Sequence, residues 1–208
     1  MRKFRIALTK GRLEDKIVGL FENAGLDCDE LINKGRKLVL SLPDIEADVV
    51  LAKAADVITY VEQGACDVGI VGKDTILEHG GSYYEIMDLG FGACRFILAA
   101  KEDNDLFSGW RRLRIASKYP EITRGFFAKK GMDVEIIKIE GSVELAPLLG
   151  VADAIIDITE TGSTLRENGL VIVEDVCDIS ARLIVNAVAM KMRQDEVDRL
   201  VGLLTKKD

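Results

Sequence analysis

Short apolar runs alternate along this chain with longer segments in which apolar residues recur every three or four positions. The short runs are typical of strands, and the longer period is typical of amphipathic helices. The expected strands cover residues 5–9, 38–42, 49–52, 67–71, 94–100, 114–117, 134–139, 154–158, 170–177 and 183–190. The expected helices cover residues 13–24, 56–63, 120–130, 142–149 and 194–204, and residues 75–78 have the spacing of a capping box at a further helix start. This alternation predicts an α/β fold with mixed, largely parallel sheets.

The chain also contains an internal echo. Residues 64–75 and 150–161 both read Gly-x-x-Asp-x-x-Ile-x-x-x-acid-Thr, and each segment follows an expected helix. We interpret this as two similar lobes, with a chance similarity between two strand–turn–helix units as the alternative. Ligands of open α/β sheets bind beyond the carboxyl ends of strands. We therefore expect a cleft between the lobes, with Asp74 and Glu160 beside it.

Composition narrows the class of protein. The chain has 208 residues and a net charge of −7, which argues against a general nucleic-acid binder. Its four cysteines have no CxxC spacing, so reduced thiols in a cytoplasmic protein are expected. Neither a signal peptide nor a run of transmembrane length is expected. The single histidine, His79, is expected at a helix end, which removes most support for His-based catalysis.

The most informative segment is residues 153–164, where an apolar run ends in Asp157 and Glu160. A small hydroxyl-and-glycine loop follows, made of Thr161, Gly162, Ser163 and Thr164. Backbone N–H groups and hydroxyls of such a loop can surround a phosphate. Thr164 has capping-box spacing to Glu167, so we expect it to cap a helix. Two acids beside a phosphate loop indicate a phosphorylated sugar, whereas the alternative is only a well-capped turn.

Other candidate ligand groups lie in the first half of the chain. Lys10-Gly11-Arg12 separates an expected strand from an expected helix, and its cations could contact a polyphosphate. Gly72-Lys73-Asp74 follows a strand in the same way, and Lys53 follows another. Each has a simpler interpretation: solvated cations at a strand end, an Asp74 that interacts with a helix dipole, or ordinary loop polarity.

Several segments together resemble one enzyme family. An acid-x-x-acid-Thr-Gly-x-Thr loop after a strand is similar to the phosphoribosyl-pyrophosphate loop of phosphoribosyltransferases. The wider pattern resembles the ATP phosphoribosyltransferase family, the first enzymes of histidine biosynthesis. The segments that carry the resemblance, in the family's order, are residues 10–13, 60–64, 67–74, 114–120, 141–147 and 157–170.

The resemblance implies a fold and an assembly. The fold would be two α/β lobes like those of type II periplasmic binding proteins, with the active site in the cleft between them. Residues 1–92 and 178–208 would form the first lobe, and residues 93–177 the second. The length resembles the short form of the family, which lacks a C-terminal regulatory domain. Such chains work in a hetero-oligomer with a regulatory subunit that looks like histidyl-tRNA synthetase.

The resemblance also implies a reaction, in which N1 of ATP attacks phosphoribosyl pyrophosphate (PRPP) and expels pyrophosphate. Asp157 and Glu160 would be catalytic and contact the ribose hydroxyls. The PRPP loop would comprise Thr159, Thr161, Gly162, Ser163 and Thr164, with the 5′-phosphate on Thr161 to Thr164. ATP or the diphosphate would be bound by Lys10, Gly11, Arg12, Lys53, Gly72 and Asp74. Mg²⁺ would arrive mainly with the diphosphate, and its protein ligands are left open.

Two departures from the family and two alternatives accompany this hypothesis. Ser117 stands where the family commonly has threonine, so the hydroxyl is kept. Lys53 stands where the family usually has arginine, so the charge is kept but the bidentate fork is lost. A non-enzymatic binder of a phosphorylated metabolite is one alternative function. A phosphoribosyltransferase with another acceptor base is the other.

Overall fold

The computed structural model describes residues 2–108 and 111–205, and it divides the chain into two compact units. Unit 1 runs to Gly92 and resumes at Ser180, whereas unit 2 spans Ala93–Ile179. The first boundary coincides with the expected one at 92/93. The expected return at 177/178 is two residues early, because strand β10 (Leu170–Ile179) continues to its end within unit 2. No helix in the described part of the chain is long and apolar enough to cross a membrane.

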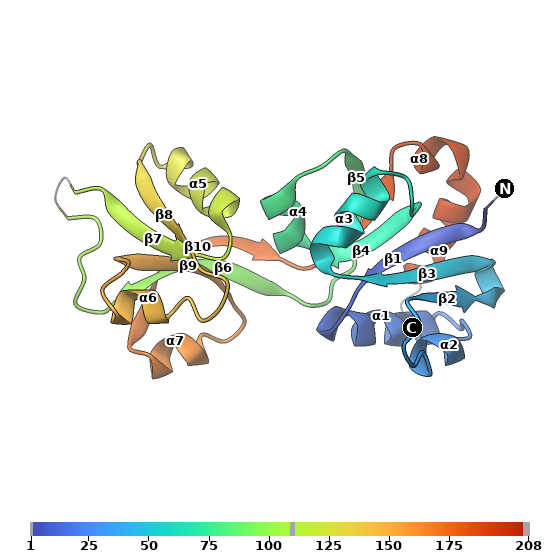
Figure 1. Ribbon diagram of the computed structural model, residues 1–208, viewed down its shortest axis with the longest axis horizontal. Coiled ribbons are helices and arrows are strands. Elements are labelled where there is room, and N and C mark those ends of the chain that lie inside the picture. The colour runs from blue at the N-terminus through green and yellow to red at the C-terminus, as the bar shows by residue number, and fades with distance from the viewer. Residues whose placement is uncertain (1, 109–110, 206–208) are drawn as a thin grey trace. The chain divides into compact units, whose positions relative to one another are not determined.

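Unit 1 is built on a six-stranded sheet of order β2-β3-β1-β4-β11-β5 (Figure 1). Its strands are β1 (Phe4–Thr9), β2 (Val39–Leu42), β3 (Ala47–Ala52), β4 (Val68–Gly72), β5 (Tyr83–Asp88) and β11 (Ala181–Asn186). Its helices are α1 (Arg12–Asn23), α2 (Asp29–Ile32), α3 (Ala54–Glu62), α4 (Lys73–His79), α8 (Ala189–Met192) and α9 (Gln194–Leu204), with a 3₁₀ turn at Pro43–Ile45. Ile6 and Leu8 of β1 pack in one cluster with α1 and α9, whereas Ala7 packs in another with α3. Because successive strand residues face opposite sides, helices cover both faces of this sheet.

Unit 2 is built on a five-stranded sheet of order β10-β6-β9-β7-β8. Besides β10, its strands are β6 (Cys94–Lys101), β7 (Leu113–Ser117), β8 (Val134–Lys138) and β9 (Ala154–Thr159). Its helices are α5 (Pro120–Lys129), α6 (Leu145–Leu148) and α7 (Ser163–Glu167). Ile156 of β9 packs with Phe127 of α5, whereas Ile155 packs with Ala146 of α6 and Leu165 of α7. Strand β9 is therefore central and buried on both faces.

The two sheets share one topology. In unit 1, β3, β1 and β4 are parallel neighbours, and β11 and β5 follow with antiparallel pairings. In unit 2, β8, β7 and β9 are parallel neighbours, and β6 and β10 follow with antiparallel pairings. The echo in the sequence is thus confirmed as a structural repeat, with β4 equivalent to β9.

The two units share a side-chain hydrogen bond at equivalent positions of the repeat. The hydroxyl of Thr9 donates to the carbonyl oxygen of Ile70 at 3.0 Å, and the hydroxyl of Ser117 donates to that of Ile156 at 2.7 Å. Each bond ties the end of a strand to the equivalent neighbouring strand. The hydroxyl of Ser117 therefore has a structural use.

The expectation of largely parallel sheets is wrong. Four of the nine strand pairings are parallel and five are antiparallel. Four of the antiparallel pairings involve β11 in unit 1 or β6 in unit 2, and the fifth joins the consecutive strands β2 and β3, which only a 3₁₀ turn separates. A parallel pair needs a crossover connection, usually a helix. Apolar periodicity does not record strand direction, so the alternation alone could not reveal this.

Three element boundaries differ from expectation for local reasons. Strand β11 ends at Asn186, not at residue 190, because the Asn186 side chain accepts the N–H groups of Val188 and Ala189 and turns the chain into α8. The expected helix at 142–149 shortens to α6, in which Pro147 occupies the first turn, where proline is tolerated. Helix α4 begins at Lys73, so Thr75 lies inside its first turn and does not cap it.

Helix α2 and strand β5 were not expected. Exposed and half-buried residues do not alternate regularly along β5, so the segment lacks the two-residue period that is typical of a strand. His79 is the last residue of α4, as predicted.

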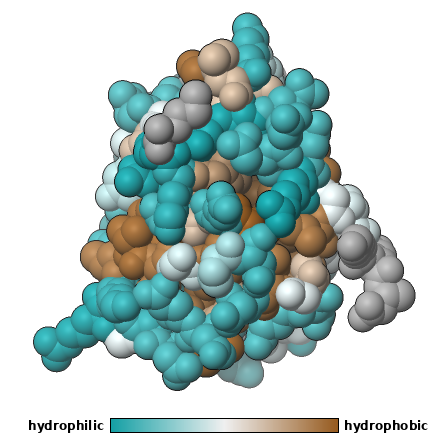
Figure 2. All heavy atoms as spheres, turned by 90° about the vertical axis from the view of Figure 1, so that its right-hand side faces the viewer, coloured by the Kyte–Doolittle hydropathy of each residue, from teal (hydrophilic) through white to brown (hydrophobic). Residues whose placement is uncertain are grey.

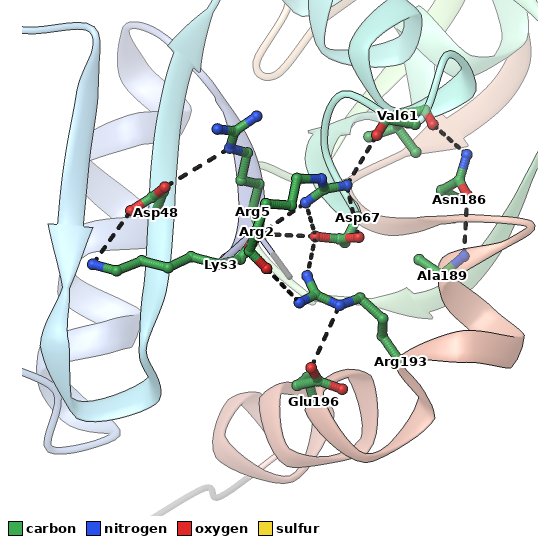
Figure 3. A network of polar contacts seen from close by, with 11 residues as sticks. Arg2, Lys3, Arg5, Asp48, Val61, Asp67, Asn186, Ala189, Arg193 and Glu196 are labelled. Atoms are coloured by element: carbon green, nitrogen blue, oxygen red, sulfur yellow. Dashed lines mark hydrogen bonds and ion pairs between the residues drawn. The ribbon is translucent and has the colours of Figure 1, made fainter.

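An ion-pair cluster closes the amino-terminal edge of the unit 1 sheet (Figure 3). Arg2 donates to the carboxylate of Asp67 at 2.6 and 3.0 Å, and Arg193 donates to it at 2.9 Å. Arg193 also donates to the backbone carbonyl of Arg2. Because Asp67 is nearly fully buried, this cluster fixes the first strand to the returning C-terminal segment.

Apolar side chains remain exposed on unit 1. Ile32, Leu38 and Val39 are each 54% exposed, and Met192 is 74% exposed. Figure 2 shows a face of the molecule on which apolar residues form a band between polar ones. Apolar surface of this kind is common where proteins contact partners.

Candidate active site

The loop after β9 has a defined backbone conformation. Strand β9 ends at Thr159, and Gly162 adopts the left-handed region with φ 72° and ψ 12° before α7 begins at Ser163. A non-glycine residue is strained there. Gly162 is buried, whereas Thr161, Ser163 and Thr164 are exposed. The loop therefore presents hydroxyl side chains around a tight turn that requires glycine.

Hydrogen bonds within the loop hold it in shape. The hydroxyl of Thr159 accepts the N–H of Gly162 at 2.8 Å, so Thr159 acts on the loop itself. The hydroxyl of Thr161 donates to that of Ser163 at 3.2 Å. Arg166 Nη1 donates to the carbonyl oxygen of Thr161 at 3.1 Å. Among the described residues, the backbone N–H groups of Thr161 and Thr164 have no hydrogen-bond partner. These two donors and the hydroxyls remain for an anion.

The expected capping box at Thr164 is wrong. Gly162 is the cap residue of α7, so Thr164 lies in the first turn. Helix α7 has only five residues, so its dipole is small. Anion binding by this loop must therefore rest on individual N–H and O–H donors.

The two candidate acids have different surroundings. Asp157 lies inside β9 opposite Ile97 and is half-buried, whereas Glu160 is exposed in the loop. Burial raises the pKa of Asp157 to about 6, and the negative charge of Glu144 adds to the rise. The N–H of Ile158 and the charge of Lys118 oppose it. Asp157 is therefore a carboxyl group whose ionisation falls near neutral pH.

The cationic candidates gather at one edge of the unit 1 sheet. Lys10 follows β1, Lys53 follows β3 and Gly72 ends β4, and these three strands are parallel neighbours. The N–H of Lys10 donates to the carbonyl of Ala52 at 2.9 Å. Because Ala52 directly precedes Lys53, the backbones of Lys10 and Lys53 lie side by side. The three candidates therefore lie at the carboxyl ends of parallel strands, which share one edge of the sheet, as the sequence predicts.

These cations are not paired with acids. Lys10, Arg12 and Lys53 form no ion pair among the described residues, whereas Lys73 in neighbouring α4 is paired with Glu85. Unpaired cations at one sheet edge suit an anionic ligand. Gly11 supports this edge by adopting φ 97° and starting α1, with its carbonyl accepting the N–H of Glu14 at 2.8 Å.

Gly72 and Asp74 form a steric pair. A Cβ at residue 72 would lie 2.1 Å from Asp74 Oδ1, so only glycine leaves room for the carboxylate where it stands. Asp74 is in the first turn of α4, as the simpler interpretation of this residue expected. That position leaves its carboxylate at the same strand edge as Lys10 and Lys53.

The structure thus gathers the predicted residues into two sets. The loop and its acids belong to unit 2, and the cations, Gly72 and Asp74 belong to unit 1. Sequence reasoning missed two residues that act on the unit 2 set: Glu144, whose charge acts on Asp157, and Arg166, which bonds the loop. Lys118, which the sequence offered as a cleft residue or as ordinary loop polarity, also acts on Asp157 through its charge. A cation one helical turn beyond a phosphate loop is a signal that could have pointed to Arg166. No group of three or more His, Cys, Asp or Glu residues within the described ranges could hold a metal ion.

Comparisons with known proteins agree with one another. Residues 53–206 match the family described as HisG: ATP phosphoribosyltransferase. The ATP phosphoribosyltransferase of Clostridium kluyveri is 59% identical over 201 residues, which cover 97% of this chain and 92% of the relative. That of Clostridium novyi is 54% identical over 203 residues, covering 97% and 96%.

Solved structures give the same picture of the fold. A chain of the ATP phosphoribosyl transferase (HisG:HisZ) complex from Thermotoga maritima superposes with a TM-score of 0.82 at 31% identity, covering 97% of this chain and 96% of that one. The periplasmic aliphatic sulphonate binding protein SsuA from Escherichia coli superposes with a TM-score of 0.59 at 13% identity, covering 97% and 67%. The expected likeness to periplasmic binding proteins is confirmed at the level of fold.

Proposed function

The chain belongs to the ATP phosphoribosyltransferase family, and from that premise we propose how its two sets of residues carry out the family's reaction. N1 of the adenine of ATP attacks the anomeric carbon of PRPP. The new C–N bond forms as the C–O bond to the diphosphate breaks, and pyrophosphate leaves with the electron pair. The product is N1-(5-phosphoribosyl)-ATP. A ring nitrogen and a good leaving group need positioning and charge stabilisation more than a protein nucleophile.

The conformation of the β9–α7 loop is the observation that carries the proposal. The loop binds the 5′-phosphate through the hydroxyls of Thr161, Ser163 and Thr164 and through N–H groups that have no partner in the described chain. Left-handed Gly162 makes the turn, and its lack of a side chain keeps the loop open. Asp157 and Glu160 accept hydrogen bonds from the ribose hydroxyls. An ionised Asp157 also stabilises positive charge that develops on the ribose ring in the transition state.

The cationic edge of unit 1 binds the polyphosphate of ATP or the diphosphate of PRPP. Lys10, Arg12 and Lys53 are the three cations that form no ion pair among the described residues there. A lysine at position 53 supplies charge without a planar fork, which suits a polyphosphate with several accessible oxygens. Gly72 and Asp74 complete this edge.

Mg²⁺ fits this site only as a partner of the substrate. The described residues offer no three-ligand cluster, but Mg²⁺ commonly binds one or two carboxylates together with substrate phosphates and waters. Asp157 and Glu160 are the carboxylates that would contact it, and the ion would neutralise charge on the departing diphosphate.

We further propose that the chain is the catalytic subunit of a short-form enzyme. It covers 92–96% of the length of the Clostridium relatives named above, and 96% of a chain from a complex titled HisG:HisZ. The exposed apolar side chains of unit 1 supply surface for such an assembly. The partner would be a regulatory subunit that looks like histidyl-tRNA synthetase, in a cytoplasmic hetero-oligomer.

The test is a pyrophosphate-release assay on the purified chain with PRPP, Mg²⁺ and ATP, with and without the candidate regulatory subunit. We expect release that requires ATP, is lost when Mg²⁺ is chelated, and yields N1-(5-phosphoribosyl)-ATP by mass spectrometry. Parallel reactions with adenine, GTP and orotate test other acceptors. Turnover with one of these in place of ATP would overturn the acceptor assignment. Binding of PRPP without turnover under every condition would favour a non-enzymatic binder.

A further inference from the structure

One peptide group in the β9–α7 loop is held at both ends. The peptide that joins Thr161 to Gly162 has its N–H on Gly162 and its C=O on Thr161. Thr159 Oγ1 accepts that N–H at 2.8 Å, and Arg166 Nη1 donates to that carbonyl oxygen at 3.1 Å. The first holder comes from the end of β9 and the second from α7. A strand and a helix therefore fix the orientation of the same peptide plane.

This peptide needs such holding, because glycine tolerates both signs of φ. A peptide plane that precedes glycine can rotate, and rotation here would break both bonds and change the backbone angles of Thr161 and Gly162. Those angles set where the N–H of Thr164 and the hydroxyls of Thr161 and Ser163 lie relative to one another. The orientation of this peptide thus determines whether the donors of the loop converge on an anion.

Arg166 is placed to act specifically on this peptide. Besides the bond to Thr161, its Nη1 lies 3.4 Å from the point that a Cβ on Gly162 would occupy. Its own N–H donates to the carbonyl of Gly162 at 3.2 Å, which anchors the arginine to the turn that it holds. In the part of the chain that the structure describes, Arg166 forms no ion pair. Its positive charge is therefore not cancelled by a neighbouring acid in a chain of net charge −7.

We propose that Arg166 is a positioning residue for PRPP binding, which clamps the Thr161–Gly162 peptide together with Thr159 in the orientation that accepts the 5′-phosphate. This inference rests on the proposed function of the loop. Thr159 then serves as the second half of the clamp, and its hydroxyl contacts Gly162 instead of the phosphate. Arg166 adds a cation beside the anion site without having to touch the reacting atoms.

The kinetic test compares Arg166→Met and Arg166→Lys with Arg112→Met in the assembled enzyme. Arg112 is an exposed arginine of the same unit that is paired with exposed Asp133, so its removal controls for loss of one charge. We expect Arg166→Met to raise the KM for PRPP about tenfold, the size of one lost charge-assisted hydrogen bond. The KM for ATP should stay within twofold, and Arg166→Lys should recover part of the loss. A KM for PRPP that matches that of Arg112→Met would overturn the proposal.

The second arm tests whether the two residues act as one clamp. Thr159→Val should raise the KM for PRPP, and Thr159→Ser should restore it, because serine keeps the accepting hydroxyl. Combining Thr159→Val with Arg166→Met should raise the KM by less than the product of the single effects, since both changes release the same peptide. Fully multiplicative effects would show independent roles and contradict a shared clamp.

Amide hydrogen exchange without substrates separates this proposal from the proposed function. Exchange of the Gly162 N–H should be faster in Arg166→Met than in Arg112→Met and the unaltered protein. Unchanged exchange would overturn the clamp, whatever the kinetics. If exchange is faster but the unaltered enzyme shows no transfer from PRPP, the clamp stands and the function assigned to the loop fails.

Discussion

Asp67 and Asp153 make the same backbone contact in the two units of the chain. Asp67 Oδ2 accepts the N–H of Arg5 at 2.8 Å, and Asp153 Oδ2 accepts the N–H of Arg114 at 2.8 Å. Each aspartate stands just before a central strand and holds the start of the parallel strand beside it. The aspartate of the repeated sequence pattern is therefore a structural residue, in contrast to the acid that ends the pattern at the candidate site.

Replacing Asp153 should destabilise unit 2. Its side chain is 8% exposed and also pairs with Arg111 at 2.9 Å. We expect Asp153→Ala to lower the free energy of unfolding by about 2–3 kcal/mol, since it leaves a buried N–H and two guanidinium groups without their acceptor. Asp133→Ala is the control, because that carboxylate is 82% exposed, and it should cost at most about 0.5 kcal/mol. Equal losses in urea denaturation would contradict a structural role for Asp153.

The same residue predicts a pH dependence of stability. Burial tends to raise the pKa of Asp153, but the hydrogen bonds from Arg114 and Arg111 outweigh it and hold the pKa below its usual 3.8. A lowered pKa contributes stability that is present above 3.8 and is lost as the pH falls through the folded-state value. The stability difference between the unaltered protein and Asp153→Ala should accordingly shrink below about pH 4. A difference that stays constant down to pH 2 would contradict the assignment.

Gly162 and Gly150 offer a matched pair of substitutions. Their φ values are 72° and 71°, so alanine is strained equally at both, but only at Gly162 does a Cβ approach a neighbour, Arg166 Nη1 at 3.4 Å. Both variants should lose about 1–2 kcal/mol of stability. Only Gly162→Ala should also raise the KM for PRPP, by about tenfold or more, since only there does the backbone strain fall within the loop that presents its donors to the 5′-phosphate. Steady-state kinetics with unchanged KM in Gly162→Ala would exclude the loop from PRPP binding.

Asp157 predicts the acidic limb of the rate profile. Burial, together with the charge of Glu144, raises the pKa of Asp157 to about 6, so the kcat/KM for PRPP should fall as the pH drops through 6. The second ionisation of a phosphate also lies near pH 6. The pH–rate profile of the unaltered enzyme therefore does not distinguish ionisation of Asp157 from ionisation of the substrate. Glu144→Gln should move the limb to lower pH, which a substrate ionisation cannot do. Asp157→Asn should lower kcat and leave ATP affinity unchanged, and an effect confined to ATP binding would contradict its catalytic role.

Ionisation of Asp157 should lower the stability of the fold, in contrast to ionisation of Asp153. A folded-state pKa raised from 3.8 to about 6 makes a contribution to stability that is present below 3.8 and lost as the pH rises through 6. Asp157→Asn should therefore raise the Tm at pH 8 and leave it nearly unchanged near pH 4. Thermal unfolding at the two pH values checks this. A variant that is less stable than the unaltered protein at pH 8 would show that the ionised carboxylate does not destabilise the fold.

Arg12 and Lys16 test the cationic edge of unit 1. Both are exposed on α1 one turn apart, but Arg12 stands at the carboxyl end of β1. Arg12→Met should raise the KM for ATP or for PRPP about fivefold or more, as expected for loss of a charge-assisted contact to phosphate. Lys16→Met should leave both within twofold. Equal effects of the two variants would reduce the role of this edge to long-range electrostatics.

Local patterns were reliable where local physics decides the structure. The last helix was predicted at residues 194–204, which are the bounds of α9, because its apolar period is uninterrupted. Gly162 was recognised because glycine is needed where a strand turns sharply into a helix. Asn186 was missed as a strand end, because its two bonds to Val188 and Ala189 depend on the particular turn that follows.

Within the candidate site, distant contacts were invisible. The charge that raises the pKa of Asp157 belongs to Glu144, thirteen positions earlier in the chain and on another element. Thr159 and Arg166 hold the same peptide across a left-handed turn. Neither the two-residue period of a strand nor the 3.6-residue period of a helix predicts such a contact.

By itself, the sequence determined the alternation of most strands and helices, the internal repeat, and the hydroxyl-and-glycine loop with its two acids. These follow from side-chain periodicity and from the backbone freedom of glycine, which are properties of neighbouring residues. Only the tertiary structure decided the strand directions, the different surroundings of Asp157 and Glu160, and the part that Arg166 takes in the loop. Those depend on which segments pack together, because burial, charge and hydrogen-bond geometry arise between residues far apart in the chain.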